Sequence, residues 1–169
     1  MPARDDDVVA AASFDAVFHA EYRGLVALAA ATSGDRVRAE DIVQEAMARL
    51  DREWASVSAY ERPGAWLRRV TINLALSQRR RLVREASALL RLDRREPSFD
   101  PAPPAEHRHL WELVGRLPGK QRAVIALHYL DDASIDEIAD VLDIAPSTAR
   151  VHLHRARQTL RDRLEEVDR

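Results

Sequence analysis

The chain has 169 residues, of which 46% are hydrophobic and 32% charged, and its formal net charge is −2 at pH 7. This length allows one medium domain or two small ones, and the composition is typical of a folded, helix-rich protein. The sequence contains no cysteine, which excludes disulfides and cysteine-ligated zinc and fits a reducing compartment. The first residues lack an apolar signal segment, and no apolar run is long enough to span a bilayer. We therefore expect a cytoplasmic protein that is not itself membrane-embedded.

Apolar residues recur at helical spacing along the chain, and no alternating β-branched run interrupts them, so we predict an all-α fold. Residues 1–12 are charged and alanine-rich without an apolar stripe, and we expect them to be flexible. From Phe14 to Ala29 an apolar stripe predicts the first helix, which Ser33-Gly34 ends. We assign the aromatic residues of this helix to the core.

The second predicted helix, from Val37 to Trp54, has two different faces. One face is apolar and suits the core, whereas the other carries Asp41, Gln44 and Glu45. From the pattern alone, this polar face is either solvated or a docking site for a partner.

The third predicted helix begins near Ala65, after a polar loop in which Pro63 suits a helix start. Residues 66–95 hold nine basic and two acidic side chains. The predicted polar surface of this helix comprises Arg68, Arg69, Asn73, Arg79, Arg80, Arg81 and Arg84. Arg69 and Asn73 lie one turn apart, where a guanidinium fork and an amide can reach the same groove or strand. This charge density favours binding to a polyanion over a merely solvated face.

A proline-rich segment predicts the domain boundary, because residues 97–104 contain four prolines and no apolar stripe. We therefore predict two small helical domains, at residues 13–91 and 108–169, joined by an extended linker at residues 92–107. In the second domain, two short helices are expected at about residues 110–117 and 121–130.

The last part of the chain predicts a helix-turn-helix. Ser134 and Glu137 have the spacing of a capping box, which starts a short helix, and Pro146 prevents that helix from continuing. A second helix is expected from about Ser147, and its inward stripe comprises Ala149, Leu153, Ala156, Leu160 and Leu164.

The outer face of this last helix is basic, with Arg150, His154 and Arg157 directed away from the stripe. Residues 150–163 contain five arginines and one acid, although the chain as a whole is acidic. By pattern alone, an ordinary helical hairpin remains open. The charge distribution favours a surface that binds nucleic acid.

Together these parts resemble a group IV sigma factor of the sigma-70 family, also called an extracytoplasmic-function (ECF) sigma factor. The segments that carry the resemblance are AEDIVQEAMARL (39–50), PGAWLRRVTINLALSQRRR (63–81) and LPGKQRAVIALHYLDDASIDEIADVLDIAPSTARVHLHRARQTLR (117–161). The resemblance implies a sigma region 2 domain followed by a sigma region 4 domain. It also implies a protein that binds core RNA polymerase, recognises the −35 and −10 promoter elements and helps to open the promoter.

The resemblance assigns roles to particular residues. The motif that docks on the β′ clamp helices of core polymerase matches Asp41, Gln44 and Glu45, while region 4 would meet the β flap. A flipped base would lie in the loop at residues 58–62. The −10 element, as single-stranded DNA, would contact Tyr60, Arg68, Arg69, Asn73, Arg80 and Arg81. The −35 element would contact Ser147, Thr148, Arg150, Val151, His152, His154 and Arg155.

Three departures from the family pattern lie around the helix-turn-helix. Asp143 stands where glycine is usual, so an aspartate must adopt a turn conformation there. Pro146-Ser147 replaces Val-Gly, and Val151-His152 replaces Ser-Arg. These departures affect the expected promoter sequence rather than the role.

The sequence lacks the parts of an enzyme, so we expect no catalytic residue, cofactor, metal or small-molecule substrate. It has no glycine-rich phosphate loop, and His152 and His154 are two positions apart, which prevents them from sharing a metal on a helix. Two other classes remain: a free-standing helix-turn-helix regulator, and a sigma-like adaptor that binds polymerase without initiating. By resemblance, an anti-sigma factor is a further expected partner.

Overall fold

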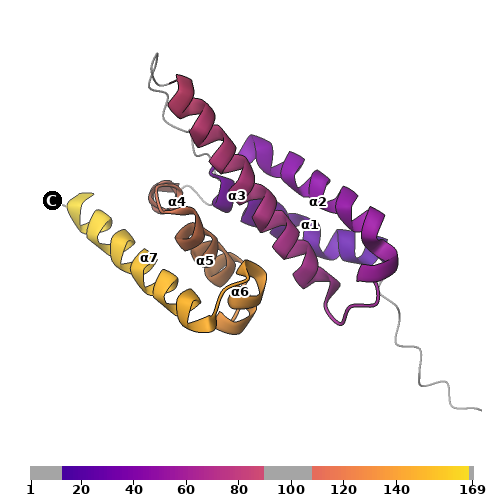
Figure 1. Ribbon diagram of the computed structural model, residues 1–169. Coiled ribbons are helices and arrows are strands. Elements are labelled where there is room, and N and C mark those ends of the chain that lie inside the picture. Colours follow the sequence, from indigo (N-terminus) through magenta and orange to yellow (C-terminus); the bar gives the residue numbers. More distant parts are fainter. Residues whose placement is uncertain (1–12, 90–107, 168–169) are drawn as a thin grey trace, which may run out of the picture.

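The computed structural model describes residues 13–89 and 108–167, which form seven helices and no strand (Figure 1). The helices are α1 (Phe14–Ser33), α2 (Arg36–Val57), α3 (Pro63–Leu89), α4 (Arg108–Gly115), α5 (Gly119–Leu130), α6 (Ile135–Leu142) and α7 (Pro146–Val167). The predicted all-α fold is therefore confirmed. The predicted flexible segment at residues 1–12 and the predicted linker at residues 92–107 lie outside the described residues.

Local capping explains where the first two helices begin and end. The side chain of Ser13 caps α1 by accepting a hydrogen bond from the Ala16 N–H at 3.1 Å. α1 ends at Ser33 and is followed by Gly34, whose φ of 77° is left-handed and suits glycine. Asp35 then caps α2 by accepting from the Arg38 N–H at 3.2 Å. The predicted stop at Ser33-Gly34 is thus confirmed.

α1, α2 and α3 pack against one another around a first apolar core. The apolar face predicted for α2 is buried there, while the predicted core aromatics of α1 are only partly buried at its edge. The rings of Phe14 and Trp54 meet edge to face, with their centroids 5.7 Å apart. The residues of this core that are essentially inaccessible include Leu25, Val43, Leu50 and Leu67.

The C-terminal half contains the helix-turn-helix. Ser134 Oγ accepts from the Glu137 N–H at 3.2 Å, and the Ser134 N–H donates to Glu137 Oε2 at 2.8 Å, so the predicted capping box is present. α6 ends at Leu142 and is followed by Asp143, which takes a left-handed conformation with φ 52° and ψ 55°. α7 follows and contacts α4, α5 and α6.

The inward stripe predicted for α7 is buried, except at its end. Leu164 is 36% exposed, whereas Ala149, Leu153, Ala156 and Leu160 are buried. Because α7 has 22 residues while α4 and α5 have 8 and 12, its last turns have few residues to pack against. The assignment of Leu164 to the core was therefore wrong.

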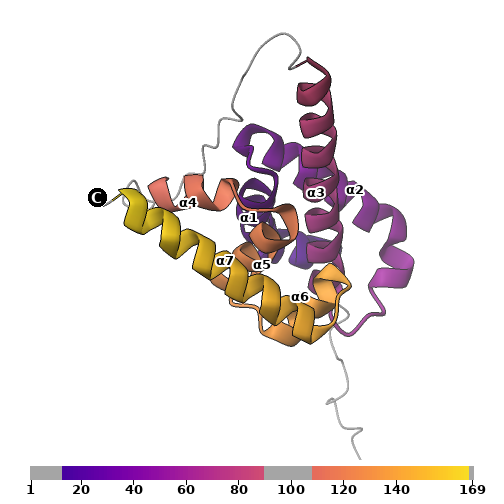
Figure 2. The ribbon, with the colours of Figure 1, turned by 60° about the vertical axis from the view of Figure 1, so that its left-hand side comes forward.

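The two halves pack directly against each other, with α4–α7 along one side of the α1–α3 bundle (Figures 1 and 2). α1 and α3 are consequently buried on two sides. Leu28 of α1 and Ile72 and Leu76 of α3 face the C-terminal half and share a second core with its helices. That core includes Val114, Leu127, Ile138, Leu142 and Leu153.

A buried arginine crosses the boundary between the halves. The Arg122 side chain of α5 is 1% exposed, and its Nε donates to the carbonyl oxygen of Thr32, at the end of α1, at 2.7 Å. Arg79 of α3, predicted to lie on the polar surface, is instead half-buried and donates to the Ser33 carbonyl at 3.0 Å. The prediction for Arg79 was wrong because periodicity does not register that a second layer of helices covers this side of α3.

Among the described residues, no helix is both long enough and apolar enough to cross a membrane.

Candidate nucleic-acid interface

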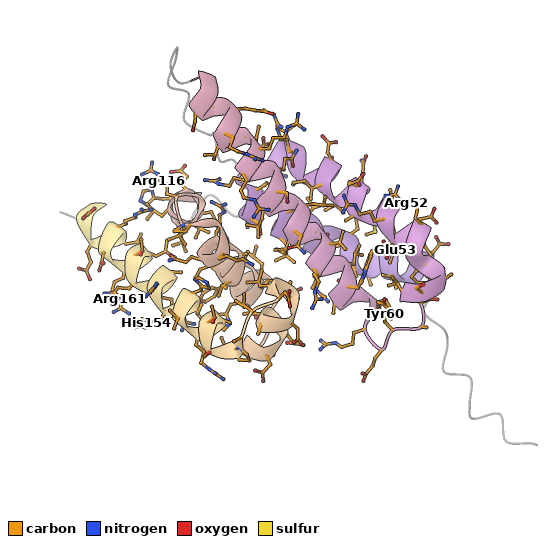
Figure 3. All side chains as sticks on the ribbon, in the orientation of Figure 1. Arg52, Glu53, Tyr60, Arg116, His154 and Arg161 are labelled. Atoms are coloured by element: carbon orange, nitrogen blue, oxygen red, sulfur yellow. The ribbon has the colours of Figure 1, made fainter. Side chains whose placement is uncertain are left out.

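The outer face of α7 is open. Arg150, His154 and Arg155 are exposed, while Ala149 and Leu153 anchor the opposite side of the helix in the core. His154 and Arg161 point away from α5 in Figure 3. The other predicted contacts at the start of α7 are also exposed, namely Ser147, Thr148 and Val151. Most of the predicted −35 residues therefore share one accessible surface.

His152 is the exception on α7, because its side chain is half-buried. Its Nδ1 is buried and has no hydrogen-bond partner among the residues that the structure describes. Burial lowers the pKa of His152 below its usual range, and the nearby cations Lys120 and Arg155 lower it further. A positive charge on this ring is therefore disfavoured.

Arg157 has a structural role that the pattern of α7 did not reveal. Its Nε donates to the Tyr129 hydroxyl at 2.9 Å, its Nη2 lies 3.0 Å from His128 Nε2, and its guanidinium carbon lies 5.5 Å from the Tyr129 ring centre. These contacts join α7 to the end of α5. Arg157 is therefore less available to a ligand than the exposed residues before it.

The second basic surface lies on α3 and the loop before it. Arg69, Asn73, Arg80 and Arg81 lie on α3, where Arg69 hydrogen-bonds to the C-terminal half and Arg81 forms an ion pair with Glu85 at 2.7 Å. Tyr60, 49% exposed, lies in the loop between α2 and α3 (Figure 3).

Arg68 differs from the other predicted −10 residues, because it is half-buried between two carboxylates. Its Nη2 lies 2.9 Å from Glu21 of α1, and its Nε lies 2.8 Å from Asp131, at the end of α5. Burial raises the pKa of Asp131, although Arg68 acts in the opposite direction. In this arrangement Arg68 serves packing between the halves rather than an open surface.

A cleft of about 340 Å³ separates the α3 surface from the C-terminal half. Tyr60, Trp66 and Arg69 line one wall, and Glu137 and Asp140 line the other. The Arg69 guanidinium donates to the backbone carbonyl of Asp140 across the cleft. The structure thus brings the predicted −10 surface against α6, which the sequence did not predict.

An ion pair joins Arg62 to Glu137 at the mouth of this cleft. The Arg62 hydrogen bond, followed by those of Ser134, lowers the pKa of Glu137 to about 2. Glu137 therefore caps its own helix and holds an arginine of the other half. No local signal identified this second role, because the partners are 75 residues apart.

The polar face of α2 lies on another side of the molecule. Asp41, Gln44 and Glu45 are all exposed, and Glu45 pairs with Arg49 at 2.9 Å. α2 packs against α1 and α3, so helices α4–α7 leave this face uncovered in the described part of the chain. The three predicted docking residues thus form one accessible polar surface.

Within the described ranges, no three His, Cys, Asp or Glu side chains are grouped so that they could hold a metal ion.

The chain matches two family descriptions, Sigma-70 region 2 over residues 17–85 and Sigma-70, region 4 over residues 107–160. It is 34% identical over 168 residues to the ECF RNA polymerase sigma factor SigE of Mycolicibacterium smegmatis, covering 94% of this chain and 64% of that protein. It is 32% identical over 152 residues to the probable RNA polymerase sigma factor RfaY of Xanthomonas campestris, covering 83% of this chain but 37% of that protein. The chain therefore spans less than two thirds of either relative.

Other similarities extend over most of both chains. The ECF RNA polymerase sigma factor SigW of Bacillus subtilis is 30% identical over 148 residues, which are 79% of each protein. The sigma factor RpoE of Bartonella quintana, solved in complex with the anti-sigma factor NepR, superposes with a TM-score of 0.76 at 25% identity, covering 92% of this chain and 98% of that one. With both regions in order along one chain, this protein belongs to the extracytoplasmic-function group of the sigma-70 family of RNA polymerase sigma factors.

Proposed function

We propose that this protein binds core RNA polymerase, recognises the −35 and −10 promoter elements and helps to open the promoter. The observation that carries this proposal is the coexistence of three separate surfaces on one chain: the polar face of α2, the basic face of α3 and the open face of α7. Each surface alone would also suit a different kind of protein. Their combination matches what a protein must offer in order to connect a polymerase to two DNA elements.

The −35 element would be read by the beginning of α7. Arg150 and His154 lie one turn apart on the exposed side, near the end of a recognition helix that commonly meets base edges. Ser147 and Thr148 precede them at the helix start, where hydroxyls and backbone N–H groups suit phosphate oxygens. The Val151 side chain offers no hydrogen bond, so it would read either a thymine methyl or no base at all.

The −10 element would be held as single-stranded DNA on α3 and the preceding loop. Arg69 and Asn73 can form hydrogen bonds to unpaired bases, while Tyr60 offers a ring for stacking. Arg80 and Arg81 continue the basic surface toward the end of α3. Arg68 would join this site only in a conformation in which its ion pair with Asp131 is broken.

Core polymerase would bind through Asp41, Gln44 and Glu45, which are accessible without any rearrangement, and region 4 would meet the β flap. Two surfaces that each bind DNA weakly gain affinity when the polymerase holds them at a fixed spacing. Neither surface therefore needs to bind DNA tightly alone. This role requires no catalysis and no cofactor, and it places the protein in the cytoplasm with the polymerase.

An anti-sigma factor is a further partner that we propose. The Bartonella quintana sigma factor, matched across both halves of this chain, was solved with an anti-sigma factor bound. A regulator of that kind would keep the DNA surfaces from the promoter.

A mobility-shift experiment separates this function from that of a free-standing regulator. Promoter fragments from the genome that encodes the chain are incubated with the protein alone, core polymerase alone, or both. We expect a specific complex only with both components. Tight, sequence-specific binding by the protein alone, at palindromic sites, would identify a free-standing regulator instead.

A further inference from the structure

The proposed −10 surface of this chain contacts the chain's own second half. At the α3–α6 cleft, three arginines of the first half contact the second half: Arg62 pairs with Glu137, Arg68 with Asp131, and Arg69 donates to the carbonyl oxygen of Asp140. We call Asp131, Glu137 and Asp140 the acidic edge. Each contact places an oxygen acceptor against a guanidinium, as a phosphate or base oxygen of DNA would.

The acidic edge differs in charge from the rest of the DNA-binding half. The segment from residue 131 to residue 143 carries six acidic side chains and no basic one, whereas α7 is basic at its start. Region 4 therefore presents opposite charges on two sides. One side suits DNA, and the other suits the basic surface that binds DNA in region 2.

We propose that the acidic edge is an intramolecular interaction surface that occupies the −10-reading face of the free protein in place of DNA, and that promoter binding requires its release. The inference rests on the proposed function, since it takes Arg62 to Arg69 as part of the −10 site. It adds a regulation of that site by the protein's own second half.

The polar contacts of the acidic edge are weak enough to be released. The Arg62–Glu137 pair is largely exposed, and such pairs contribute little individually. The apolar contact of Ile72 and Leu76 with the C-terminal half fixes the closed arrangement more firmly. A polymerase that held the two halves at separate promoter elements, as proposed above, would have to replace both kinds of contact.

The first test removes the charges of the acidic edge without removing the helix cap. Asp131→Asn with Glu137→Gln leaves a glutamine at the third helical position, which still completes a capping box. The matched control is Asp132→Asn with Asp136→Asn, because both aspartates lie in the same segment and make no ion pair within the described ranges. The two double variants have the same net charge, so general attraction to DNA rises equally in both.

Opening is measured directly by energy transfer between two dyes. The chain has no cysteine, so Glu53→Cys on α2 and Gln158→Cys on α7 give two specific labelling sites on exposed positions. We expect lower transfer efficiency in the acidic-edge variant than in the control. Anisotropy with a labelled single-stranded −10 oligonucleotide should show about three- to tenfold tighter binding by the acidic-edge variant than by the control.

A second variant opens the molecule without changing charge. A Cβ at Gly119 would lie 3.1 Å from Leu76 Cδ2, across the boundary between the halves, so Gly119→Val inserts methyl groups into that contact. Its control is Gly24→Val, since a Cβ at Gly24 of α1 would meet no described atom within 4 Å apart from the nearby backbone of its own helix. Gly119→Val should lower transfer efficiency and tighten oligonucleotide binding, whereas Gly24→Val should do neither.

The outcomes separate this inference from the function on which it rests. Unchanged transfer efficiency in both test variants would overturn the inference, whatever the affinity. Lower transfer efficiency without tighter binding would show that the exposed face does not bind the −10 strand, which overturns both the competition with DNA and the proposed role of Arg69.

Discussion

Arg79 and Arg122 donate hydrogen bonds to the same acceptor, the carbonyl oxygen of Gly115, each at 2.9 Å. The two guanidiniums come from α3 and α5 and meet at the end of α4. Burial, followed by repulsion from Arg79, lowers the pKa of Arg122 to about 9, so Arg122 still carries its charge at neutral pH. The carbonyls at the ends of α1 and α4 carry partial negative charge and stabilise both arginines in place of carboxylates.

We predict that Arg122→Met destabilises the protein by about 2–3 kcal/mol, because it removes the hydrogen bonds of Arg122 to the carbonyls of Thr32 and Leu117 and leaves Gly115 with Arg79 alone. Urea denaturation followed by circular dichroism measures this free energy of unfolding. Arg116→Met is the control, since Arg116 is exposed on the adjoining turn and should cost less than about 0.5 kcal/mol. Equal losses in the two variants would mean that Arg122 has no special role in joining the halves.

Protonation of His152 should make stability depend on pH. Its pKa is lower in the folded protein than its ordinary value, so the unfolded chain binds the proton first as the solution becomes acidic. Stability is therefore expected to fall as pH drops below about 6.5, the ordinary histidine value, until the folded-state pKa is reached. His152→Gln should lose less stability than the wild type between about pH 7.5 and pH 5.5 in the same denaturation experiment. An identical loss would show that the ring is not held neutral.

The exposed face of α2 should be separable from the fold. Asp41→Ala with Gln44→Ala should weaken binding to core polymerase, while changing stability by no more than about 0.5 kcal/mol per site, because both side chains are exposed. Competition with the wild type for core polymerase measures the affinity. The control is Asp51→Ala with Glu53→Ala, at exposed positions farther along the same helix. If test and control variants compete equally well, this face is not the docking site.

The open face of α7 should divide into residues that read bases and residues that do not. Arg150→Ala is expected to cost about 1–3 kcal/mol at the cognate −35 sequence and to relax preference there, because Arg150 lies near the start of the helix. Arg161→Ala should have a smaller effect that is independent of sequence and fades with added salt. Holoenzyme binding to a panel of −35 variants at two salt concentrations distinguishes them. A changed sequence profile for Arg161→Ala alone would mean that the register of α7 on DNA is wrong.

Prediction from the sequence succeeded for features that depend on residues close together in the chain. The capping box of Ser134 and Glu137, the glycine stop at Gly34 and the turn conformation of Asp143 each depend on a few neighbouring residues, and all are present. The buried stripe of α7 also followed from helical periodicity up to Leu160. These signals determined the helix-turn-helix and the side of α7 that stays open.

Prediction from the sequence failed for side chains whose burial or contacts depend on a helix far away in the chain. Arg68 and Arg79 look like surface residues of a basic helix, yet both are partly buried because the C-terminal helices pack against α1 and α3. Helical periodicity within each segment does not indicate whether two segments joined by a proline-rich linker pack together. The contact of Arg69 with Asp140, 71 residues away, has the same origin.

Above all, we expect this chain to give core polymerase the ability to start transcription at specific promoters. Run-off transcription of genomic fragments by core polymerase, with and without the protein, tests this role when the transcript ends are then mapped. We predict discrete start sites that appear only when the protein is present and that share −35 and −10 sequences. A protein that binds core polymerase but yields no new start site would be an adaptor, and that result would contradict the proposed function.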